Sequence, residues 1–306
     1  MAKVLVATEK PFAPAAVNGI KNILDKAGYE LVLLEKYTEK ADLLKAVEDV
    51  DALIIRSDKA TAEVIKAGKN LKIIVRAGAG YDNIDLEAAT ANNVVAMNTP
   101  GQNSNAVAEL AIGMMVYHAR SFFNGKAGTE LKDKKLGIHA FGNVGKIIAT
   151  IAKGFGMDVY AYDPFIDSSV IEDEGVSPLK SVEELYETCN YVSLNIPANE
   201  KTKGSINYSL LSSMPGKAIL VNTARKEVVN EDDLLKVYSE RDDFVYISDI
   251  APDCKDKIAE DYEGRYFFTP KKMGAQTAEA NINAGAAAAI QIVNFLEKGD
   301  KTFQVN

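Results

Sequence analysis

The alternation of short apolar runs with helical patterns is the feature that most restricts the fold of this 306-residue chain. Runs rich in Val, Ile and Leu recur along the whole sequence, and segments with helical spacing separate them. Strands that are apolar almost throughout and alternate with helices predict parallel sheets covered by helices on both faces. The predicted strands are 3–8, 30–35, 52–56, 71–76 and 94–98, then 136–141, 157–162, 191–196, 218–223, 244–250 and 265–270.

The strands fall into two series that a polar stretch separates. A long helical pattern from Asn105 to about Phe123 is followed by the polar sequence NGKAGTELKDKK, and an Ala-rich helical pattern over 276–298 closes the chain at Gly299. A length of 306 residues is typical of two domains of ordinary size. We therefore predict an α/β protein of two doubly wound, Rossmann-like units, the second beginning near residue 100.

Composition excludes several classes of function. The formal net charge of −8 argues against broad nucleic-acid binding, which needs a basic face. Only two cysteines, Cys189 and Cys254, are present, so a disulfide framework is not expected. The sequence shows no secretory signal pattern at its start and no apolar run long enough for a membrane span. We expect a cytoplasmic enzyme that needs no metal.

A glycine-rich turn opens the second series. The segment LGIHAFGNVG (136–145) reads as a strand, a turn and the start of a helix. In such a turn Gly142 would let the backbone approach a pyrophosphate, and Gly145 would let the helix pack closely on the strand. The helix N-terminus would offer N–H groups to the phosphates. Ala140 takes the place of the usual first glycine, so the pattern alone is equally typical of an ordinary tight turn.

The end of the next predicted strand favours NAD over NADP. Asp163 closes the run MDVYAYD, about 20 residues after Gly142. A carboxylate at that place accepts hydrogen bonds from ribose hydroxyls and repels a 2′-phosphate. Pro164 and Phe165 follow, with no arginine to bind a 2′-phosphate. The alternative for Asp163 is a solvent-facing turn residue before proline.

Polar clusters follow three further strands of the second series. Asn222, Thr223 and Arg225 come after 218–223, Asp249 lies near the end of 244–250, and the segment TPKKMGAQT follows 265–270. Because ligands of open parallel sheets bind outside the carboxyl ends of the strands, these clusters are expected at one edge.

At this point the chain resembles the D-isomer-specific 2-hydroxyacid dehydrogenase family and, within it, the short D-3-phosphoglycerate dehydrogenases that lack a regulatory C-terminal domain. The resemblance rests on segments spread over nearly the whole chain: RAGAGYDNIDLEAAT (76–90), NTPGQNSNAVAEL (98–110), GIHAFGNVG (137–145), AYDP (161–164), LVNTARKEVVNEDDL (220–234) and TPKKMGAQTAEA (269–280).

The resemblance implies a discontinuous architecture and a set of site residues. Residues 1–100 and 276–306 would form a flavodoxin-like substrate domain, and 101–275 an NAD-binding Rossmann domain through which a homodimer assembles. Arg225 would hold the substrate carboxylate, for which a planar guanidinium fork is suited, and Asp249 the nicotinamide carboxamide. The other implied cofactor contacts are Gly142, Asn143, Val144, Gly145, Asp163, Pro197, Thr223, Ala224, Arg225 and Gly274. The implied substrate contacts are the N–H groups of Gly78, Ala79 and Gly80, and Asn103 at the hinge.

The sequence departs from the family in its proton-transferring residue. The family pattern TPHIG supplies a histidine, whereas this chain reads TPKKMG, and alignment on GAQTAEA places Lys272 there with Lys271 beside it. His118 and His139 lie too early to replace that histidine. A lysine can exchange the proton if burial or Arg225 lowers its pKa from about 10.4.

The glutamate that partners the family histidine is also missing. Cys254 stands at its place, and Asp253 or Asp256 is a possible substitute. Lysine has no tautomer to fix, so the two losses are chemically consistent.

The predicted reaction is NAD-dependent oxidation of D-3-phosphoglycerate to 3-phosphohydroxypyruvate, the first step of serine biosynthesis. Arg56 and Arg76, with Lys59 nearby, lie at or beyond strand ends of the first series, where they could bind a small phosphorylated 2-hydroxy acid; ordinary surface charge is the alternative. Two rivals stay open: a hydroxypyruvate, glyoxylate or D-lactate-type reductase on the same fold, and a non-catalytic protein that senses NADH.

Overall fold

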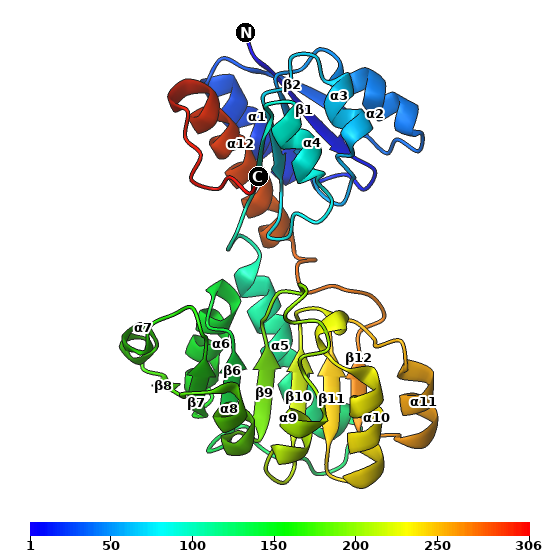
Figure 1. Ribbon diagram of the computed structural model, residues 1–306, viewed down its shortest axis with the longest axis vertical. Coiled ribbons are helices and arrows are strands. Elements are labelled where there is room, and N and C mark those ends of the chain that lie inside the picture. Colours follow the sequence, from blue (N-terminus) through cyan, green and yellow to red (C-terminus); the bar gives the residue numbers. More distant parts are fainter. The chain divides into compact units, whose positions relative to one another are not determined.

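The computed structural model describes residues 1–306 and divides them into two compact units. Unit 1 comprises Met1–Asn103 and Ala275–Asn306, and unit 2 comprises Ser104–Gly274. The sequence placed these boundaries at residues 100 and 276. Each unit is a parallel sheet with helices on both faces, which confirms the predicted α/β class (Figure 1).

Unit 1 is built on a five-stranded sheet with the order β2-β1-β3-β4-β5, which is the flavodoxin-like order. Its elements are β1 (Lys3–Thr8), α1 (Pro14–Lys26), β2 (Glu30–Glu35), α2 (Lys40–Val47), β3 (Ala52–Ile55), α3 (Ala62–Ala67), β4 (Ile73–Arg76), α4 (Leu86–Ala91), β5 (Val95–Asn98) and α12 (Ala278–Lys298).

The last helix of the chain belongs to unit 1. Alternate strand residues face a cluster formed by α1 and α12, and the intervening ones face α2, α3 and α4. Helices α1 and α12 approach closely because Gly285 has no side chain: a Cβ there would lie 3.1 Å from Ile20 Cδ1. Thr277 caps the start of α12 and Gly299, at φ 67°, ends it where the sequence predicted.

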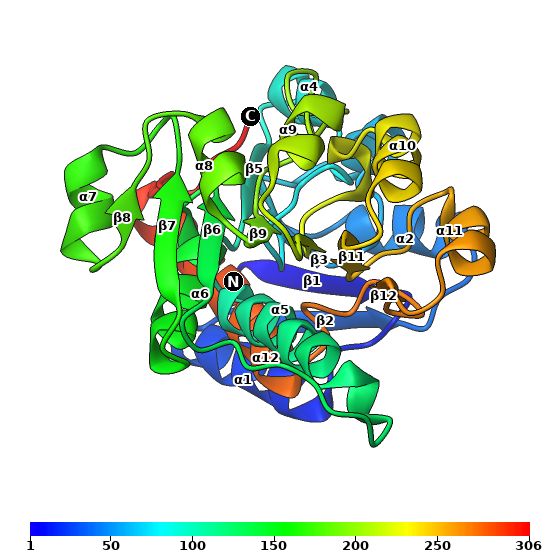
Figure 2. The same cartoon turned by 90° about the horizontal axis from the view of Figure 1, so that it is seen from below.

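Unit 2 is built on a seven-stranded sheet with the order β12-β11-β10-β9-β6-β7-β8, in which the first six strands by sequence follow the standard Rossmann order (Figures 1 and 2). Its elements are α5 (Ser104–Ala119), the 3-10 turn η1 (Ser121–Phe123), β6 (Lys135–His139), α6 (Asn143–Gly154), β7 (Asp158–Tyr162), α7 (Ser168–Asp173), β8 (Ser177–Pro178), α8 (Val182–Thr188), β9 (Tyr191–Leu194), α9 (Tyr208–Ser213), β10 (Ile219–Asn222), η2 (Lys226–Val228), α10 (Glu231–Glu240), β11 (Val245–Ser248), α11 (Lys255–Asp261) and β12 (Tyr266–Phe268).

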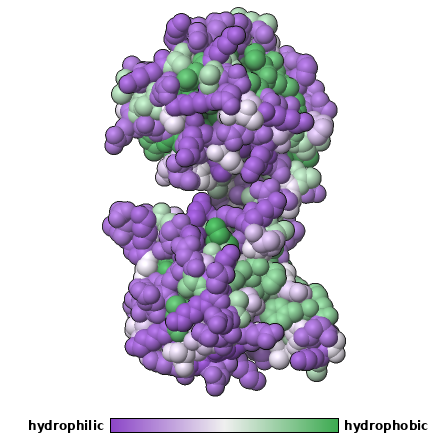
Figure 3. Space-filling view, turned by 90° about the vertical axis from the view of Figure 1, so that its right-hand side faces the viewer, coloured by the Kyte–Doolittle hydropathy of each residue, from purple (hydrophilic) through white to green (hydrophobic).

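Alternation of apolar side chains divides the core of unit 2 into two layers. In β10, Ile219 and Val221 face a cluster that includes α5 and α6, whereas Leu220 faces α8, α9 and α10. Hydrophilic residues cover most of the visible face of each unit (Figure 3). None of the helices combines the length and the apolar character that a membrane crossing requires.

Two local predictions were wrong, and one short strand was missed. The run 30–35 is not a buried strand: β2 is at a sheet edge, and Leu33 is 45% exposed. The long helix ends at Ala119 rather than near Phe123, because Ser121, Phe122 and Phe123 all have positive φ. The short strand β8 was not predicted, since two residues carry no periodic signal.

Candidate active site

The predicted cofactor residues lie in loops at one edge of the unit 2 sheet. All its paired strands are parallel, so their carboxyl ends meet at that edge. The strand order reverses at β6, which pairs with β7 on one side and with β9 on the other. Ligands of an open α/β sheet usually bind at such a topological switch point. The loops after β6, β7, β10, β11 and β12 carry the residues described below.

The glycine-rich turn after β6 is shaped to admit a ligand. Helix α6 begins at Asn143, and Gly142 immediately precedes it. A Cβ at Gly142 would meet nothing within 4 Å, so the backbone is open there. A Cβ at Gly145 would lie 2.5 Å from Ala140 O, so this glycine permits close packing of helix on strand. Both glycines therefore suit the tasks that the sequence predicted.

The start of α6 offers donors to an anion. No side chain caps this helix, and the N–H groups of Asn143 and Val144 make no hydrogen bond within the protein. Unpaired N–H groups and the helix dipole favour a negative charge at this point. These donors and the open space at Gly142 fit the pyrophosphate of a dinucleotide.

Ala140 adopts a backbone conformation that favours glycine. Its φ is 76°, in the left-handed region, and its N–H donates to Tyr162 O at 2.9 Å. An alanine there carries strain that glycine would not. The turn thus keeps the shape of the full glycine fingerprint although it lacks the first glycine.

Asp163 helps to hold the glycine-rich turn. Its Oδ2 accepts the Phe141 N–H at 2.8 Å, and its Oδ1 accepts the Phe165 N–H at 2.9 Å. An ionised carboxylate has about four lone-pair positions, so each oxygen can still accept a ribose hydroxyl. The half-buried Asp163 is therefore more than a solvent-facing turn residue, and it fits the recognition of NAD.

Arg225 and Lys272 meet at one oxygen atom. Arg225 Nη1 donates to Ala224 O at 3.0 Å, and Lys272 Nζ donates to the same oxygen at 2.6 Å. Arg225 follows β10 and Lys272 follows β12, so the sheet brings together two cations that are distant in sequence. Both Lys271 and Lys272 are exposed, and it is Lys272 that reaches the oxygen to which Arg225 also donates.

Asn222 fixes the turn that carries Arg225, and the sequence did not single it out for this role. Its buried Nδ2 donates to Arg225 O and Tyr246 Oη, both at 3.0 Å, while its Oδ1 accepts the Ala224 N–H at 2.9 Å. Ser248 Oγ also lies 3.1 Å from Asn222 O. The signal in the sequence was a polar residue at the end of the apolar run AILVN.

The carboxylate of Asp249 is buried and binds the turn after β12. The residue is 1% exposed, and its oxygens accept the N–H groups of Met273 at 2.9 Å and Gly274 at 2.8 Å. Thr269 Oγ1 lies 3.1 Å from Oδ1. A buried carboxylate with these partners is committed to the turn after β12. The contact with the nicotinamide carboxamide implied by the family resemblance stays a prediction.

Two other predicted cofactor contacts lie beside these turns. Thr223 is buried, and its hydroxyl has no hydrogen-bond partner. Pro197 is exposed in the loop after β9, and its carbonyl accepts the hydroxyl of Thr202. An unpaired buried hydroxyl at a ligand edge is a group that a bound molecule could satisfy.

Asp253 and Asp256, the possible substitutes for the family glutamate, are both exposed. Asp253 is 79% exposed and pairs with Lys226 Nζ. Its N–H and that of Cys254 both donate to Glu231 at 2.8 Å. Asp256 is exposed in the first turn of α11. Glu231, which the sequence did not single out, thus shapes this loop.

His139 is buried, as its position in an apolar strand suggested, and His118 is half-buried. His139 ends β6 rather than lying within it, and its Nδ1 is 3.4 Å from Tyr186 Oη. Burial lowers the pKa of His139 to about 4, against the raising effect of Asp163. Burial also lowers the pKa of His118 on α5. Neither histidine is placed with Arg225 and Lys272.

In unit 1 the two predicted arginines bind backbone carbonyl groups. Arg56 lies over the Phe12 ring at 5.0 Å, with Nη1 3.4 Å from Lys10 O, and burial lowers its pKa while Asp58 opposes that shift. Arg76 Nε donates to Arg56 O at 3.0 Å. Neither arginine is a freely solvated surface charge.

The RAGAG turn after β4 differs from the predicted anion cradle at one residue. The Gly78 N–H donates to Arg76 O at 2.9 Å, so it is not available to a carboxylate. Gly78 has φ 153°, and a Cβ there would lie 1.9 Å from Arg76 Nη1. The N–H groups of Ala79 and Gly80 make no hydrogen bond within the protein. Asn103 is the last residue of this part of unit 1.

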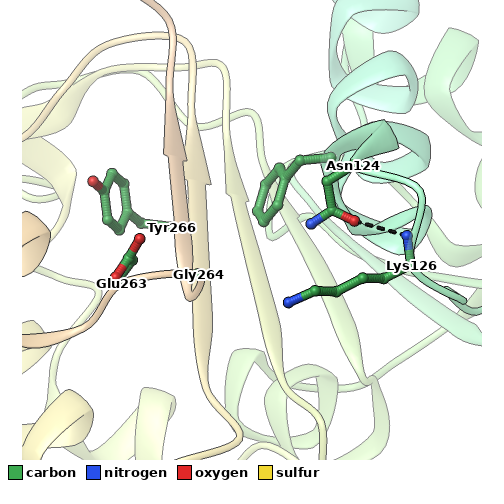
Figure 4. Close-up of a pocket in the computed structure, with 6 residues that line it drawn as sticks. Asn124, Lys126, Glu263, Gly264 and Tyr266 are labelled. Carbon is green, nitrogen blue, oxygen red and sulfur yellow. Dashed lines mark hydrogen bonds between the residues drawn. The ribbon is translucent and has the colours of Figure 1, made fainter.

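A surface pocket of about 550 Å³ in unit 2 lies elsewhere (Figure 4). It is lined by Phe122, Asn124 and Lys126 after α5, and by Glu263, Gly264 and Tyr266 where β12 begins. It is therefore at the amino end of β12, whereas Lys272 follows the carboxyl end. No group of three or more His, Cys, Asp or Glu side chains is placed to hold a metal ion.

Comparison with known proteins identifies the family. Residues 107–257 match the NAD-binding domain of the D-isomer specific 2-hydroxyacid dehydrogenases. A hydroxypyruvate reductase of Thermotoga maritima is 36% identical over 276 residues, covering 84% of this chain and 88% of that protein. D-3-phosphoglycerate dehydrogenase of Rattus norvegicus is 33% identical over 302 residues, which cover 94% of this chain but 56% of the rat protein.

A solved structure is similar over the full length of the chain. The NAD+-bound 3-phosphoglycerate dehydrogenase of Entamoeba histolytica is 50% identical, with a TM-score of 0.89, and the match covers 100% of this chain and 98% of that one. The chain therefore belongs to the D-isomer-specific 2-hydroxyacid dehydrogenase family. It is an NAD-dependent dehydrogenase of D-2-hydroxy acids, which confirms the class of enzyme and the cofactor predicted from the sequence.

Proposed function

We propose that the protein oxidises D-3-phosphoglycerate to 3-phosphohydroxypyruvate with NAD. The observation that carries the proposal is the meeting of Arg225 Nη1 and Lys272 Nζ at Ala224 O, 3.0 Å and 2.6 Å away. This arrangement places a carboxylate-binding fork beside a group that can exchange a proton. The 50% identity to a 3-phosphoglycerate dehydrogenase favours this acid among the 2-hydroxy acids.

Each cation has a distinct task in the proposed reaction. Arg225 binds the substrate carboxylate and orients the hydroxyl carbon. Lys272, in its neutral form, takes the hydroxyl proton on Nζ while the carbon–hydrogen bond breaks and a carbonyl forms. Bound NAD supplies the hydride acceptor. In the reverse direction the Lys272 ammonium returns the proton to the carbonyl oxygen.

The cofactor is assigned to the loops that fit it. The N–H groups of Asn143 and Val144 would hold the pyrophosphate, with Gly142 leaving room for it. Asp163 would accept the ribose hydroxyls. In unit 1, the binding of the substrate phosphate by Arg56 and Arg76 stays a prediction from the sequence, as does assembly of a homodimer through unit 2.

A second candidate substrate has a specific observation in its favour. The Thermotoga maritima relative, 36% identical over most of both chains, is a hydroxypyruvate reductase. Hydroxypyruvate has the same carboxylate and carbonyl that Arg225 and Lys272 would engage, but no phosphate. The phosphate is therefore the group that separates the two candidates.

Parallel assays test the substrate. Initial rates would be measured with NAD and D-3-phosphoglycerate, D-glycerate or D-lactate, and with NADH and hydroxypyruvate or glyoxylate. We expect kcat/KM for D-3-phosphoglycerate to exceed that for D-glycerate at least 100-fold. A higher value for D-glycerate or hydroxypyruvate would contradict the proposal. NADH binding with no turnover of any acid would indicate a protein that senses NADH instead.

The proton-transfer role is tested with a matched pair of lysines. Lys272→Ala is expected to lower kcat about 100-fold or more, which is typical for loss of a general acid or base, without changing the affinity for NADH. Lys271→Ala removes the same side chain one residue earlier and is expected to keep turnover within 2-fold. Equal activities of the two variants would contradict the role given to Lys272.

A further inference from the structure

We propose that Asp249 is a positioning residue that sets the place of Lys272. This inference rests on the proton-transfer role proposed for Lys272. It concerns the turn after β12, residues 269–274, which we call the lysine turn. Asp249 lies on the neighbouring loop, immediately after β11.

The carboxylate of Asp249 binds the lysine turn on both sides of Lys272. Oδ1 accepts the Met273 N–H at 2.9 Å, and Oδ2 accepts the Gly274 N–H at 2.8 Å. On the other side, Thr269 Oγ1 lies 3.1 Å from Oδ1 and 2.8 Å from Asp249 O. The residues that flank Lys272 are thus tied to one buried side chain.

The hydroxyl of Thr269 closes this turn. It has one proton and three acceptors within reach, since Lys271 O is 2.9 Å away in addition to the two oxygens of Asp249. Thr269 is buried, so water does not satisfy it. Its N–H donates to Ser248 O at 3.1 Å, which extends the pairing of β11 with β12 into the loops.

Gly274 allows the carboxylate to come this close. A Cβ on Gly274 would lie 2.9 Å from Asp249 Oδ2, so any side chain there would displace the oxygen or the turn. The lysine turn therefore accommodates Asp249 through the missing side chain of Gly274 as well as through hydrogen bonds.

This arrangement matters because a lysine side chain does not hold its own position. Its stem has several rotatable bonds, and here Nζ is found 2.6 Å from Ala224 O. The place of its Cα therefore decides whether Nζ reaches the reacting oxygen, and a displacement of about 1 Å can lower a rate about 100-fold. The carboxylate of Asp249, 1% exposed, depends on its paired N–H groups, so it holds the turn in one place.

A double-mutant cycle with Asp249→Asn and Lys272→Ala tests the coupling. The amide of Asn presents an NH₂ group where a second acceptor is needed, so one N–H of the lysine turn loses its partner. We expect Asp249→Asn to lower kcat at least 10-fold in the wild-type background and less than 2-fold in the Lys272→Ala background. The dissociation constant of NADH, followed by its fluorescence, should stay within 2-fold.

Two outcomes would overturn the inference. An equal fold loss in both backgrounds would show that Asp249 acts independently of Lys272. A large rise in the NADH dissociation constant with unchanged kcat would show that Asp249 acts on cofactor binding and not on Lys272. If Asp249→Asn does not fold, Thr269→Val takes its place in the cycle, and Thr269→Ser should restore at least half of the wild-type kcat.

A second readout separates this inference from the proposed function. Acetylation of Lys272 by acetic anhydride, measured by mass spectrometry against Lys271 in the same protein, needs no substrate. Asp249→Asn should change the labelling rate of Lys272 at least 3-fold relative to Lys271. Should Lys272→Ala retain activity, the proposed proton transfer fails, while a changed labelling rate would still support positioning. An unchanged labelling ratio would overturn it.

Discussion

The glycine-rich turn and the lysine turn lie at the same edge of one sheet, yet they are built on opposite principles. The turn at 140–145 leaves open space at Gly142 and holds Ala140 at a φ of 76°. The lysine turn has a buried carboxylate at its centre that accepts two backbone N–H groups. The first leaves room and donors for a ligand, and the second immobilises a charged side chain.

The difference follows from what each turn must present. A phosphate is bound by backbone N–H groups, so the backbone itself has to be accessible. A lysine or an arginine acts through the end of a long side chain, so its backbone has to be fixed from within. The turn that carries Arg225 is also fixed from within, because Asn222 donates to Arg225 O and accepts the Ala224 N–H. Substitutions in the two kinds of turn test this contrast.

The largest effect is expected at the fixed turns. Arg225→Lys keeps the charge but removes the planar fork, so kcat/KM for the hydroxy acid should fall about 100-fold or more while NADH affinity is unchanged. Lys226→Ala is the control: its Nζ pairs with the exposed Asp253, and exposed pairs contribute little. Activity of Arg225→Lys equal to that of the control would show that the fork is not used.

The next effect concerns the strand that leads into the glycine-rich turn. His139 is neutral in the folded protein down to a pKa of about 4, whereas in the unfolded chain it titrates near 6.5. Between these values the unfolded state binds the extra proton, so the free energy of unfolding should fall by about 3 kcal/mol as the pH drops from 7 to 4. Urea unfolding against pH measures this loss.

His139→Leu provides the comparison for that measurement. It cannot titrate, so its stability should fall less steeply between pH 6.5 and 4 than that of the wild type, whatever its stability at pH 7. Parallel curves for the two proteins would mean that the buried ring is not held in its neutral form.

A smaller effect is expected where the glycine-rich turn packs on its own strand. At Gly145 a Cβ would lie 2.5 Å from Ala140 O, so Gly145→Ala should lower stability by about 2 kcal/mol and weaken NADH binding. Gly154 ends the same helix with nothing within 4 Å of its Cβ. Gly154→Ala should therefore leave stability unchanged or raise it by up to about 1 kcal/mol. Similar losses in both variants would contradict a specific contact at Gly145.

The sequence predicted the parts of this fold that local patterns determine. Alternating apolar runs and helical spacing gave the two parallel sheets, and the polar residues that follow those runs marked the ligand edge. Gly299 marked the end of the last helix because a left-handed residue there is a local requirement. The half-exposed state of β2 was missed because an edge position depends on strand order, which is not local.

Hydrogen bonds between loops that are distant in sequence could not be predicted either. The pairing of Asp249 with Met273 and Gly274 depends on how β11 and β12 align, and no motif contains both sides of it. The γ-like turn that takes up the Gly78 N–H is a backbone detail of one loop. Local patterns therefore predicted which residues lie at the edge of the sheet, but not the hydrogen bonds that hold them there.

The smallest effect tests whether the glycine-rich turn is strained. A left-handed conformation costs a residue with a Cβ about 1–2 kcal/mol. Glycine avoids that cost but loses about 0.5–1 kcal/mol through the greater freedom of the unfolded chain. Ala140→Gly should therefore raise the free energy of unfolding by up to about 1 kcal/mol. Ala149→Gly within α6 should lower it by about 1 kcal/mol instead. If Ala140 is strained, urea unfolding should show a higher free energy of unfolding for Ala140→Gly and a lower one for Ala149→Gly. A loss of stability in both variants would show that the glycine-rich turn accommodates Ala140 without strain.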